Sequence, residues 1–337
     1  MINENTILKS RNRPFLLGPV GKDYLWGGRR LQEDYGKDMG ISPLAETWEC
    51  STHPDGSSVI RSGEYSGMSL DDLLKLHPEY LGTHGKNKCE LPILVKFIDA
   101  KEKLSIQVHP SDEYARKYEN GSLGKTEMWY VVDAGKDAEL IYGFYQNTDE
   151  ATIRRSLKKG TIEKYLQKIK VRKDDIFYIE AGTVHAIGAD ILLVEVQENS
   201  NLTYRLYDYD RLDKDGRKRE LHLEKALQNI NYKGSDTPRQ PMRVLHYNRG
   251  CASELLCRCK YFQVYRMLLN NLKMENSIEI QTNFTSFQVL LCLEGRVLLT
   301  GDDGQILDFS KGDCIFIPAE SVRLKLKGKA QLLRISC

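Results

Sequence analysis

The sequence predicts a mainly β protein of two β domains, with a few helical segments inserted in the first domain. Most of the chain either alternates apolar and polar residues or forms short β-branched runs, and both patterns are typical of strands. Helical segments do not alternate regularly with these strands, so a doubly wound parallel sheet is excluded and antiparallel sheets are expected. The length of 337 residues matches two domains of about 150 residues each.

Helical patterns are expected in three segments. Ser69 stands three residues before an acid at the start of a segment of about 69–78, which is the pattern of a helix N-terminus. The second segment, of about 147–170, is expected to break at Gly160, and the third covers about 222–230. Together they make a small helical insertion in a β framework.

Strands are expected along most of the remaining chain. In the first part they are predicted at 93–98, 105–109, 127–133, 176–179 and 191–197. Towards the C-terminus they are predicted at 262–269, 286–293, 296–299, 306–309, 314–317 and 324–326, with Gly295 and 301–304 at turns. This second group contains no helix of useful length and is typical of a small β-barrel or sandwich.

The boundary between the two domains is predicted within 233–241. This stretch is rich in turn-forming residues, and a new series of strands follows it. The first domain, expected to carry the catalytic site, then covers residues 1–238, and the second covers residues 239–337.

One segment of each predicted domain matches the other. Residues 173–185 align without gaps with residues 311–323. Each copy has a basic residue, Asp at the third place, an apolar strand, Ala, a turn and then Val. The first copy ends in His185 and the second in Arg323. A duplicated barrel with one working site and one retired site would produce this difference.

Composition and charge exclude several classes of protein. The 49 Lys and Arg against 47 Asp and Glu leave a formal net charge of +2, which argues against nucleic-acid binding through an overall basic surface. The basic run 217–219 follows turn residues and is expected in a solvated hairpin. The apolar runs are far shorter than the ~20 residues of a transmembrane helix. Neither nucleic acid nor a membrane is therefore expected as a partner.

The expected cellular location follows from the first residues and from the cysteines. Residues 1–9 place an acid before a base and contain no long apolar core, so they do not predict a secretory signal. The eight cysteines are then expected to be reduced thiols rather than disulfides. We therefore expect a cytoplasmic protein.

A possible metal site is visible in the order of polar residues near three predicted strands. Ser105, Gln107 and His109 alternate along one strand, so their side chains point to the same face. Glu127 opens a later strand, and His185 ends the repeated segment. Each histidine alone is more simply a hydrogen-bonded barrel residue. Two imidazoles, a carboxylate and an amide on neighbouring strands, however, fit a divalent metal with exchangeable positions left over.

A series of motifs along the chain carries a family resemblance. The chain resembles the type I mannose-6-phosphate isomerases in their short bacterial form, which are zinc enzymes built on cupin barrels. The resemblance spans about residues 24–222 in the family's order, whereas the C-terminal part resembles only a generic degenerate cupin. The motifs are Tyr-Leu-Trp-Gly-Gly at 24–28, Ala-Glu-Thr-Trp-Glu at 45–49, His-Pro-Asp-Gly at 53–56, Leu-Pro-Ile-Leu-Val-Lys-Phe at 91–97, Leu-Ser-Ile-Gln-Val-His-Pro at 104–110, Gly-Lys-Thr-Glu-Met-Trp at 124–129, Ala-Gly-Thr-Val-His at 181–185, Glu-Val-Gln-Glu-Asn-Ser at 195–200 and Thr-Tyr-Arg at 203–205.

The resemblance implies a fold, an activity and a set of site residues. The fold would be two cupin-like (jelly-roll) β-barrels, and the activity the interconversion of mannose 6-phosphate and fructose 6-phosphate through an enediol. One Zn²⁺ per chain is implied. The implied metal ligands are Gln107, His109, Glu127 and His185. The implied catalytic residues are Arg205, Glu195 and Lys125, and the implied substrate contacts are Lys96, Ser105 and Lys125.

The roles of individual residues stay open within this resemblance. Glu195 could transfer the proton or only hold Arg205, and Lys125 could act as the base or contact the phosphate. Lys96 could instead extend to solvent from its strand. Two histidines and a carboxylate also bind iron in oxygenases. The chain could also be a cupin that acts on a different sugar or sugar phosphate, or a non-catalytic cupin that binds a sugar phosphate.

Two positions depart from the family pattern. Asn201 stands where the family usually has Asp, between two residues that the resemblance assigns to the site. Glu180 stands where the barrel motif usually has Pro, and we expect it to alter only a turn.

Overall fold

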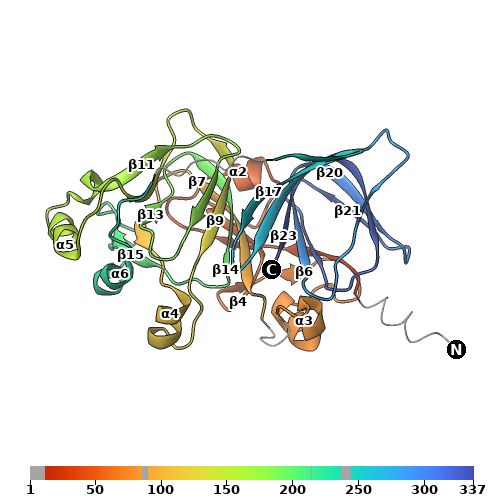
Figure 1. Ribbon diagram of the computed structural model, residues 1–337, viewed down its shortest axis with the longest axis horizontal. Helices are drawn as coiled ribbons and strands as arrows, with labels where there is room; N and C mark the ends of the chain where they lie inside the picture. The colour runs from red at the N-terminus through yellow and green to blue at the C-terminus, as the bar shows by residue number, and fades with distance from the viewer. Residues whose placement is uncertain (1–11, 86–89, 214, 237–243) are drawn as a thin grey trace.

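The computed structural model describes residues 12–85, 90–213, 215–236 and 244–337. It contains two β units that lie side by side, with helices on the outer side of the first (Figure 1). All strand pairs within the sheets are antiparallel, which confirms the predicted mainly β fold class. No helix in the described part of the chain is long and apolar enough to span a bilayer.

The first β unit is a sandwich of two sheets. The six-stranded sheet has the order β12-β9-β14-β7-β3-β2, and the five-stranded sheet has the order β11-β10-β13-β8-β15. Trp129, Leu140 and Leu193 are buried where the sheets face each other. The strands are β2 (Val20–Lys22), β3 (Glu46–Cys50), β7 (Ile93–Ala100), β8 (Ile106–Val108), β9 (Glu127–Ala134), β10 (Glu139–Phe144), β11 (Leu166–Lys170), β12 (Ile176–Ile179), β13 (His185–Ala186), β14 (Ile191–Glu198) and β15 (Tyr204–Tyr207), and a separate hairpin pairs β4 (Thr52–His53) with β5 (Gly56–Ser57).

The helices are short and mostly peripheral. They are α2 (Arg30–Glu33), α3 (Leu70–Leu76), α4 (Asp112–Tyr118), α5 (Glu150–Lys158) and α6 (Leu223–Asn229), with 3₁₀ turns at Pro78–Leu81 and Ile162–Lys164. Three of them, α3, α5 and α6, lie within the segments where the sequence predicts helices. Ser69 accepts a hydrogen bond from the Asp72 backbone N–H and caps α3. Ile153 of α5 and Leu227 of α6 pack over the outer face of the five-stranded sheet.

The predicted second helix is wrong at its C-terminal end. Residues 166–170 form strand β11, which pairs with β10. Helix α5 ends at Lys158, and Gly160 adopts a φ of +63°, a left-handed conformation that terminates helices. Leu166 and Ile169 are three residues apart, which is a helical spacing, but in the strand they lie on opposite faces and pack in different clusters. Pairing with β10 and packing against the sandwich decide the outcome.

The second β unit is built around a ten-stranded sheet. Eight strands follow the order β16-β17-β18-β23-β20-β22-β1-β6, with β19 paired to β23 and β21 paired to β20. Two of these strands, β1 and β6, come from the N-terminal part of the chain. The strands are β1 (Phe15–Gly18), β6 (Val59–Ile60), β16 (His246–Asn248), β17 (Cys251–Arg258), β18 (Gln263–Asn270), β19 (Ile278–Ile280), β20 (Gln288–Gly301), β21 (Ile306–Ser310), β22 (Cys314–Ile317) and β23 (Leu324–Ser336).

One strand of this unit differs from the prediction. The segments predicted at 286–293 and 296–299 belong to the single strand β20. A register shift between Cys292 and Glu294 leaves Leu293 as the extra residue of a bulge, and Gly295, whose φ is +85°, pairs with Ala330 within the strand instead of forming the predicted turn. The predicted domain boundary at 238/239 lies in 237–243, outside the described residues.

The two β units share one hydrophobic core. Phe97 and Val194 of the first unit belong to the same buried cluster as Phe316 and Leu333 of the second. Leu73 of α3 joins this cluster as well. The strands that carry the site described below therefore pack against the second β unit as well as within the first.

Candidate metal centre and active site

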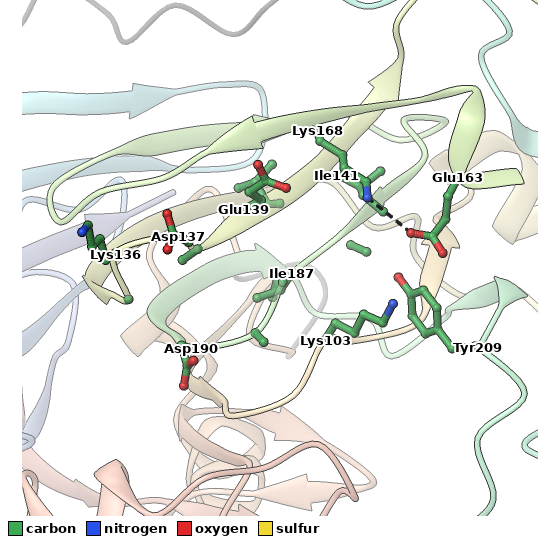
Figure 2. Close-up of a pocket in the computed structure, with 16 residues that line it drawn as sticks. Lys103, Lys136, Asp137, Glu139, Ile141, Glu163, Lys168, Ile187, Asp190 and Tyr209 are labelled. Carbon is green, nitrogen blue, oxygen red and sulfur yellow. Dashed lines mark ion pairs between the residues drawn. The ribbon is translucent and has the colours of Figure 1, made fainter.

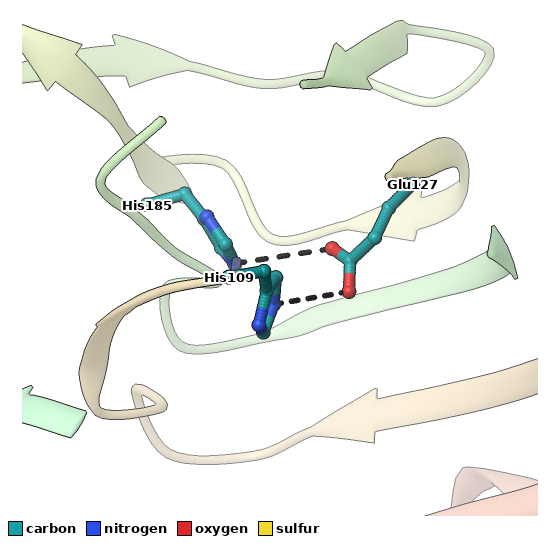
Figure 3. A group of neighbouring side chains, drawn as sticks. All are labelled: His109, Glu127 and His185. Carbon is teal, nitrogen blue, oxygen red and sulfur yellow. Dashed lines mark ion pairs between the residues drawn. The ribbon is translucent and has the colours of Figure 1, made fainter. Parts of the chain in front are cut away.

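Three strands bring together a buried group of two histidines and a glutamate. His109 follows β8, Glu127 opens β9 and His185 opens β13. Because β13 lies beside β8 with His185 opposite Gln107, the short strand β13 sets the position of the second imidazole. The ligand atoms of His109, Glu127 and His185 lie within 4.8 Å of one another, and Figure 3 shows them converging on one point.

Hydrogen bonds fix the tautomers of both imidazoles. The Nδ1 atom of His109 lies 2.8 Å from the Leu202 carbonyl oxygen, and that of His185 lies 2.8 Å from the Thr183 carbonyl oxygen. A carbonyl can only accept, so each Nδ1 carries the proton and each Nε2 keeps a lone pair. Burial lowers the pKa of His109 to about 3 and also lowers the pKa of His185, so both rings are neutral.

The imidazole lone pairs of these groups face the carboxylate oxygens of Glu127. The Nε2 atom of His109 lies 3.2 Å from Glu127 Oε1, and that of His185 lies 3.8 Å from Glu127 Oε2. Within the described residues, His109 Nε2 and Glu127 Oε2 are buried without a hydrogen-bond partner, while Glu127 Oε1 lies 3.1 Å from the Lys125 ammonium group. Buried acceptors that point at each other are costly unless a cation lies between them. The donor set therefore fits a divalent metal.

Gln107 completes the predicted ligand set beside His185. Its side-chain amide lies 3.3 Å from His185 Nε2, and Ser105 Oγ donates to its other end at 3.5 Å. The two ends of a glutamine amide exchange by a half turn, so Gln107 can present its oxygen to the same point. All four residues predicted to bind metal thus lie together.

Lys96 and Glu195 form a buried charge network next to this group. Glu195 of β14 stands opposite Lys96 of β7 on one side and Trp129 of β9 on the other. Lys96 Nζ lies 3.2 Å from Glu195 Oε1 and 3.7 Å from Glu46 Oε2. Burial alone would lower the pKa of Lys96, but Glu46 and Glu195 outweigh it and raise the pKa. Lys96 is therefore a cation that does not reach solvent.

The Glu195 carboxylate is held at one oxygen by an indole. Trp129 Nε1 donates to Glu195 Oε2 at 2.9 Å. Burial raises the pKa of Glu195, and the negative charge of Glu127 raises it further. Lys125 Nζ lies 3.1 Å from Glu127 Oε1. Glu195 and Lys125 are both placed beside the candidate metal point.

Arg205 lies on β15 with its guanidinium fixed by two partners. Its Nε donates to Ser105 Oγ at 3.2 Å and its Nη1 donates to the Glu220 carbonyl at 2.7 Å. Burial and the neighbouring Arg219 lower its pKa. An arginine held in this way presents a fixed positive charge to the adjacent space.

One cavity of about 430 Å³ is lined by Lys96, Lys125, Glu195 and Arg205. Its charged walls carry five cations against three anions, which favours an anionic ligand. The cations are Lys96, Lys125, Arg205, Arg219 and Lys225, and the anions are Glu46, Glu119 and Glu195. Ser105 and Gln107 also line the cavity, so it adjoins the candidate metal point through Gln107 and Lys125.

Two of these cations are not indicated by the sequence. Arg219 is expected in a solvated hairpin, but its guanidinium pairs with Asp208 at 2.7 and 2.6 Å and it lines the cavity. Lys225 pairs with Glu119 at 2.5 Å at the same rim. Asp208 lies across a turn from Arg219 and Glu119 lies 106 residues before Lys225, so the local sequence around each cation does not indicate its partner.

The two departures from the family pattern lie at different places. Asn201 Nδ2 donates to Asp55 Oδ2 at 2.7 Å and connects the segment between Glu195 and Arg205 to the β4–β5 hairpin. Glu180 is exposed in the turn before β13.

A second cavity of about 440 Å³ lies on the other side of Ile187. Its charges are mixed, and Lys168 lies 3.4 Å from Glu163 across it (Figure 2). Lys103 and Tyr209 contribute a cation–π contact at 3.5 Å. Neither Gln107 nor Lys125, which lie beside His185 and Glu127, lines this second cavity, and both line the first one, so we assign the chemistry to the first cavity.

Parts of both β units match known protein families. Residues 15–142 match the catalytic domain of type I phosphomannose isomerases. Residues 253–337 match the cupin domain of mannose-6-phosphate isomerases. The cupin character that the sequence predicts for the fold is thereby confirmed.

Similar proteins and structures cover almost the whole chain. Mannose-6-phosphate isomerase ManA of Bacillus subtilis strain 168 is 38% identical over 323 residues, which are 95% of this chain and 98% of that protein. A mannose-6-phosphate isomerase of Streptococcus mutans is 36% identical over 295 residues, 87% of this chain and 89% of that protein. The crystal structure of the Bacillus subtilis mannose 6-phosphate isomerase superposes with a TM-score of 0.88 at 34% identity, covering 96% of this chain and 99% of the other.

Proposed function

Because the chain belongs to the type I phosphomannose isomerase family, we propose that it interconverts mannose 6-phosphate and fructose 6-phosphate. The observation that carries the proposal is the buried His109–Glu127–His185 group beside a cavity with surplus positive charge. The reaction needs both features. The metal-binding group stabilises charge at the reacting carbons, and the positively charged cavity binds a phosphorylated sugar.

The proposed metal is one Zn²⁺ per chain, held by Gln107, His109, Glu127 and His185. The unpartnered Nε2 of His109, the Nε2 lone pair of His185 and the buried Glu127 carboxylate support that assignment, because zinc prefers imidazole and carboxylate ligands. When bound, Zn²⁺ supplies positive charge that stabilises the substrate oxygen from which the enediol develops.

The proton transfer between C2 and C1 is assigned to Glu195. Trp129 orients this carboxylate through Oε2, which leaves Oε1, next to Lys96, as the atom that takes and returns the proton. The raised pKa that burial and Glu127 produce moves the carboxyl towards the range where it can do both near neutral pH. Lys96 contributes to the substrate site mainly by holding Glu195.

Arg205 and Lys125 act on the charges of the substrate. The guanidinium of Arg205, fixed through Ser105, neutralises the negative charge that spreads over the enediolate. Lys125 and Ser105 are the proposed phosphate contacts, although Lys125 would be the alternative base. A Lys125→Met variant separates these roles, because loss of a phosphate contact raises KM whereas loss of the base lowers kcat.

The proposed partner is a small sugar phosphate, and the proposed location is the cytoplasm. All seven cysteines within the described residues are free thiols, which suits a reducing compartment. The cavity carries surplus positive charge, whereas the whole chain has a formal net charge of only +2. This pattern suits a small anion better than a nucleic acid.

The test is a turnover assay in three states of the purified protein. Fructose 6-phosphate formation from mannose 6-phosphate is measured as isolated, after chelation and after zinc is restored. We expect the activity to disappear with the chelator and to return with Zn²⁺. Recovery with another divalent ion, but not with Zn²⁺, would overturn the metal assignment alone. A zinc-loaded protein that isomerises only a different hexose phosphate would overturn the substrate. If the zinc-loaded protein turned over neither mannose 6-phosphate nor any other hexose phosphate, we would conclude that it binds a sugar phosphate without catalysis.

A further inference from the structure

The loop after β17 contacts the first β unit beside the segment that carries Lys125. Strand β17 lies at the junction of the two units (Figure 1). The Tyr261 hydroxyl donates to Asp112 Oδ2 at 3.3 Å and is hydrogen-bonded to the Thr126 side chain. Lys260 Nζ lies 3.6 Å from the same Asp112 oxygen. The C-terminal unit therefore reaches residues next to the active site.

Two carboxyl groups hold the backbone on either side of Lys125. Asp112 Oδ1 accepts from the Gly124 backbone N–H at 3.0 Å, and Glu198 Oε1 accepts from the Thr126 backbone N–H at 2.9 Å. The Glu198 backbone N–H also donates to the Thr126 carbonyl at 3.1 Å. Lys125 thus lies between two anchored residues.

The two carboxyl groups are hydrogen-bonded to each other, so one of them carries a proton. Burial raises the pKa of Glu198 to about 8, whereas the pKa of Asp112 is lowered: burial opposes the shift, but the Gly124 N–H and further donors outweigh it. At neutral pH, Glu198 is therefore the donor and Asp112 the charged acceptor.

The charged and titratable groups around the pair all favour this arrangement. Arg116 on α4 lies 3.3 Å from Asp112 Oδ2, and Lys260 and Tyr261 approach the same oxygen from the loop after β17. Each stabilises a negative Asp112, which in turn keeps the proton on Glu198.

We propose that the Asp112–Glu198 carboxyl pair, completed by Tyr261 of the C-terminal β unit, positions Lys125 for the isomerase reaction. The inference rests on the proposed function. Neither Asp112 nor Glu198 lines the cavity, so both act through the backbone of 124–126 and are positioning residues. Through Tyr261, the C-terminal unit then helps to position a residue of the active site.

The ammonium group of Lys125 depends on this anchoring for its direction. Its Nζ must stay 3.1 Å from Glu127 Oε1 while its backbone N–H donates to the Pro110 carbonyl at 3.1 Å. Release of Gly124 or Thr126 moves the base of the side chain, and misplacement of about 1 Å can reduce a rate by ~10²-fold. Ionisation of Glu198 has the same effect, because two adjacent carboxylates repel each other.

The first experiment is a double-mutant cycle between Tyr261 and Lys125. Tyr261→Phe, Lys125→Met and the double variant are compared with the unchanged protein for kcat and KM at pH 7. We expect Tyr261→Phe to reduce kcat/KM by about tenfold and to add little in the Lys125→Met background, because it acts through that lysine. Equal losses in both backgrounds would overturn the proposal.

The second experiment is the pH profile of Glu198→Gln. Glutamine keeps a neutral donor towards Asp112, so this variant should retain kcat within about twofold at pH 7. In the unchanged protein, the arrangement is present below pH 8 and is lost as the pH rises through the pKa of Glu198. Activity should therefore fall above about pH 8 in the unchanged protein and persist to higher pH in Glu198→Gln. An identical alkaline limb in both proteins would contradict the proposal.

A matched control variant and the unchanged protein distinguish a failure of this inference from a failure of the proposed function. Tyr232→Phe removes another half-buried hydroxyl, which donates to the Leu227 carbonyl at 2.7 Å, and should leave kcat/KM unaltered. If Tyr232→Phe matches the loss in Tyr261→Phe, the effect is a general loss of stability and the inference fails. If the unchanged zinc-loaded protein does not isomerise mannose 6-phosphate, the proposed function fails instead.

Discussion

At the scale of single residues, the site depends on where two imidazole protons lie. His109 and His185 each donate from Nδ1 to a backbone carbonyl, which aims a lone pair on each Nε2 at the oxygens of Glu127. The protein thereby holds ligand atoms in position before any cation arrives. Each imidazole is a neutral donor, so metal binding displaces no proton from it.

Removal of either imidazole should abolish metal binding and turnover together. In His109→Ala or His185→Ala, the remaining ligands cannot surround the ion, and we expect a loss larger than the ~10²-fold that removal of an outer hydrogen-bond partner costs. Metal content by atomic emission and the rate of fructose 6-phosphate formation are measured on the same sample. His246→Ala, on the exposed strand β16, is the control and should keep both. Metal-free but active His185→Ala protein would contradict the proposed role of the metal.

Arg205 should separate metal binding from catalysis. It touches Ser105 and the Glu220 carbonyl but none of the three converging side chains. We therefore expect Arg205→Ala to keep its metal and to lose about 10²- to 10³-fold in kcat, the usual cost of losing a group that stabilises a developing anion. Steady-state kinetics and metal analysis provide the measurement. Unchanged turnover in Arg205→Ala would exclude it from the chemistry.

At the scale of secondary-structure elements, alternation along the chain predicts much of the site. Period-two spacing places Ser105, Gln107 and His109 together around β8, and the repeated segment indicates β12 and the turn that leads to His185. These predictions depend on local pattern alone. The ligand and catalytic roles of the residues stay predictions until they are measured.

Contacts between distant segments are not predictable from local pattern. The 166–170 segment has apolar residues at a helical spacing, and only its pairing with β10 makes it a strand. Arg219 has the local sequence of a solvated residue because its partner Asp208 precedes the intervening turn. The contact of Tyr261 with Asp112 joins residues of different β units. In each case a long-range partner outweighs the local signal.

The N-terminus of α3 supplies a prediction at the same scale. Ser69 Oγ accepts the Asp72 backbone N–H at 3.0 Å, and the helix it caps buries Leu70, Leu73 and Leu74 in the shared core. Ser69→Ala should lower the free energy of unfolding by about 1 kcal/mol and leave kcat unaltered. Denaturant unfolding measures this change. Ser69→Thr keeps the hydroxyl that caps the helix and donates to Asp72 Oδ2 at 2.7 Å, so it should retain the stability, and an equal loss in both variants would contradict the capping role.

At the scale of the whole molecule, the shared core makes the two β units one structural body. Phe97 and Val194 pack in one cluster with Phe316 and Leu333, and β1 and β6 of the N-terminal part extend the C-terminal sheet. The second unit therefore covers the catalytic sandwich and also contacts the Lys125 segment through Tyr261. Neither unit presents a complete core without the other.

Unfolding should consequently occur in a single transition that responds to zinc. The ligands come from or next to β8, β9 and β13, which belong to both sheets of the first unit, so the ion binds only the folded arrangement. Free zinc at a hundred times its dissociation constant stabilises the folded state by about 2.7 kcal/mol, which raises the midpoint by a few degrees. Scanning calorimetry with and without a chelator measures the shift, with His185→Ala as the control that should not respond. Two separate transitions, of which only one moves with zinc, would show that the core does not couple the units.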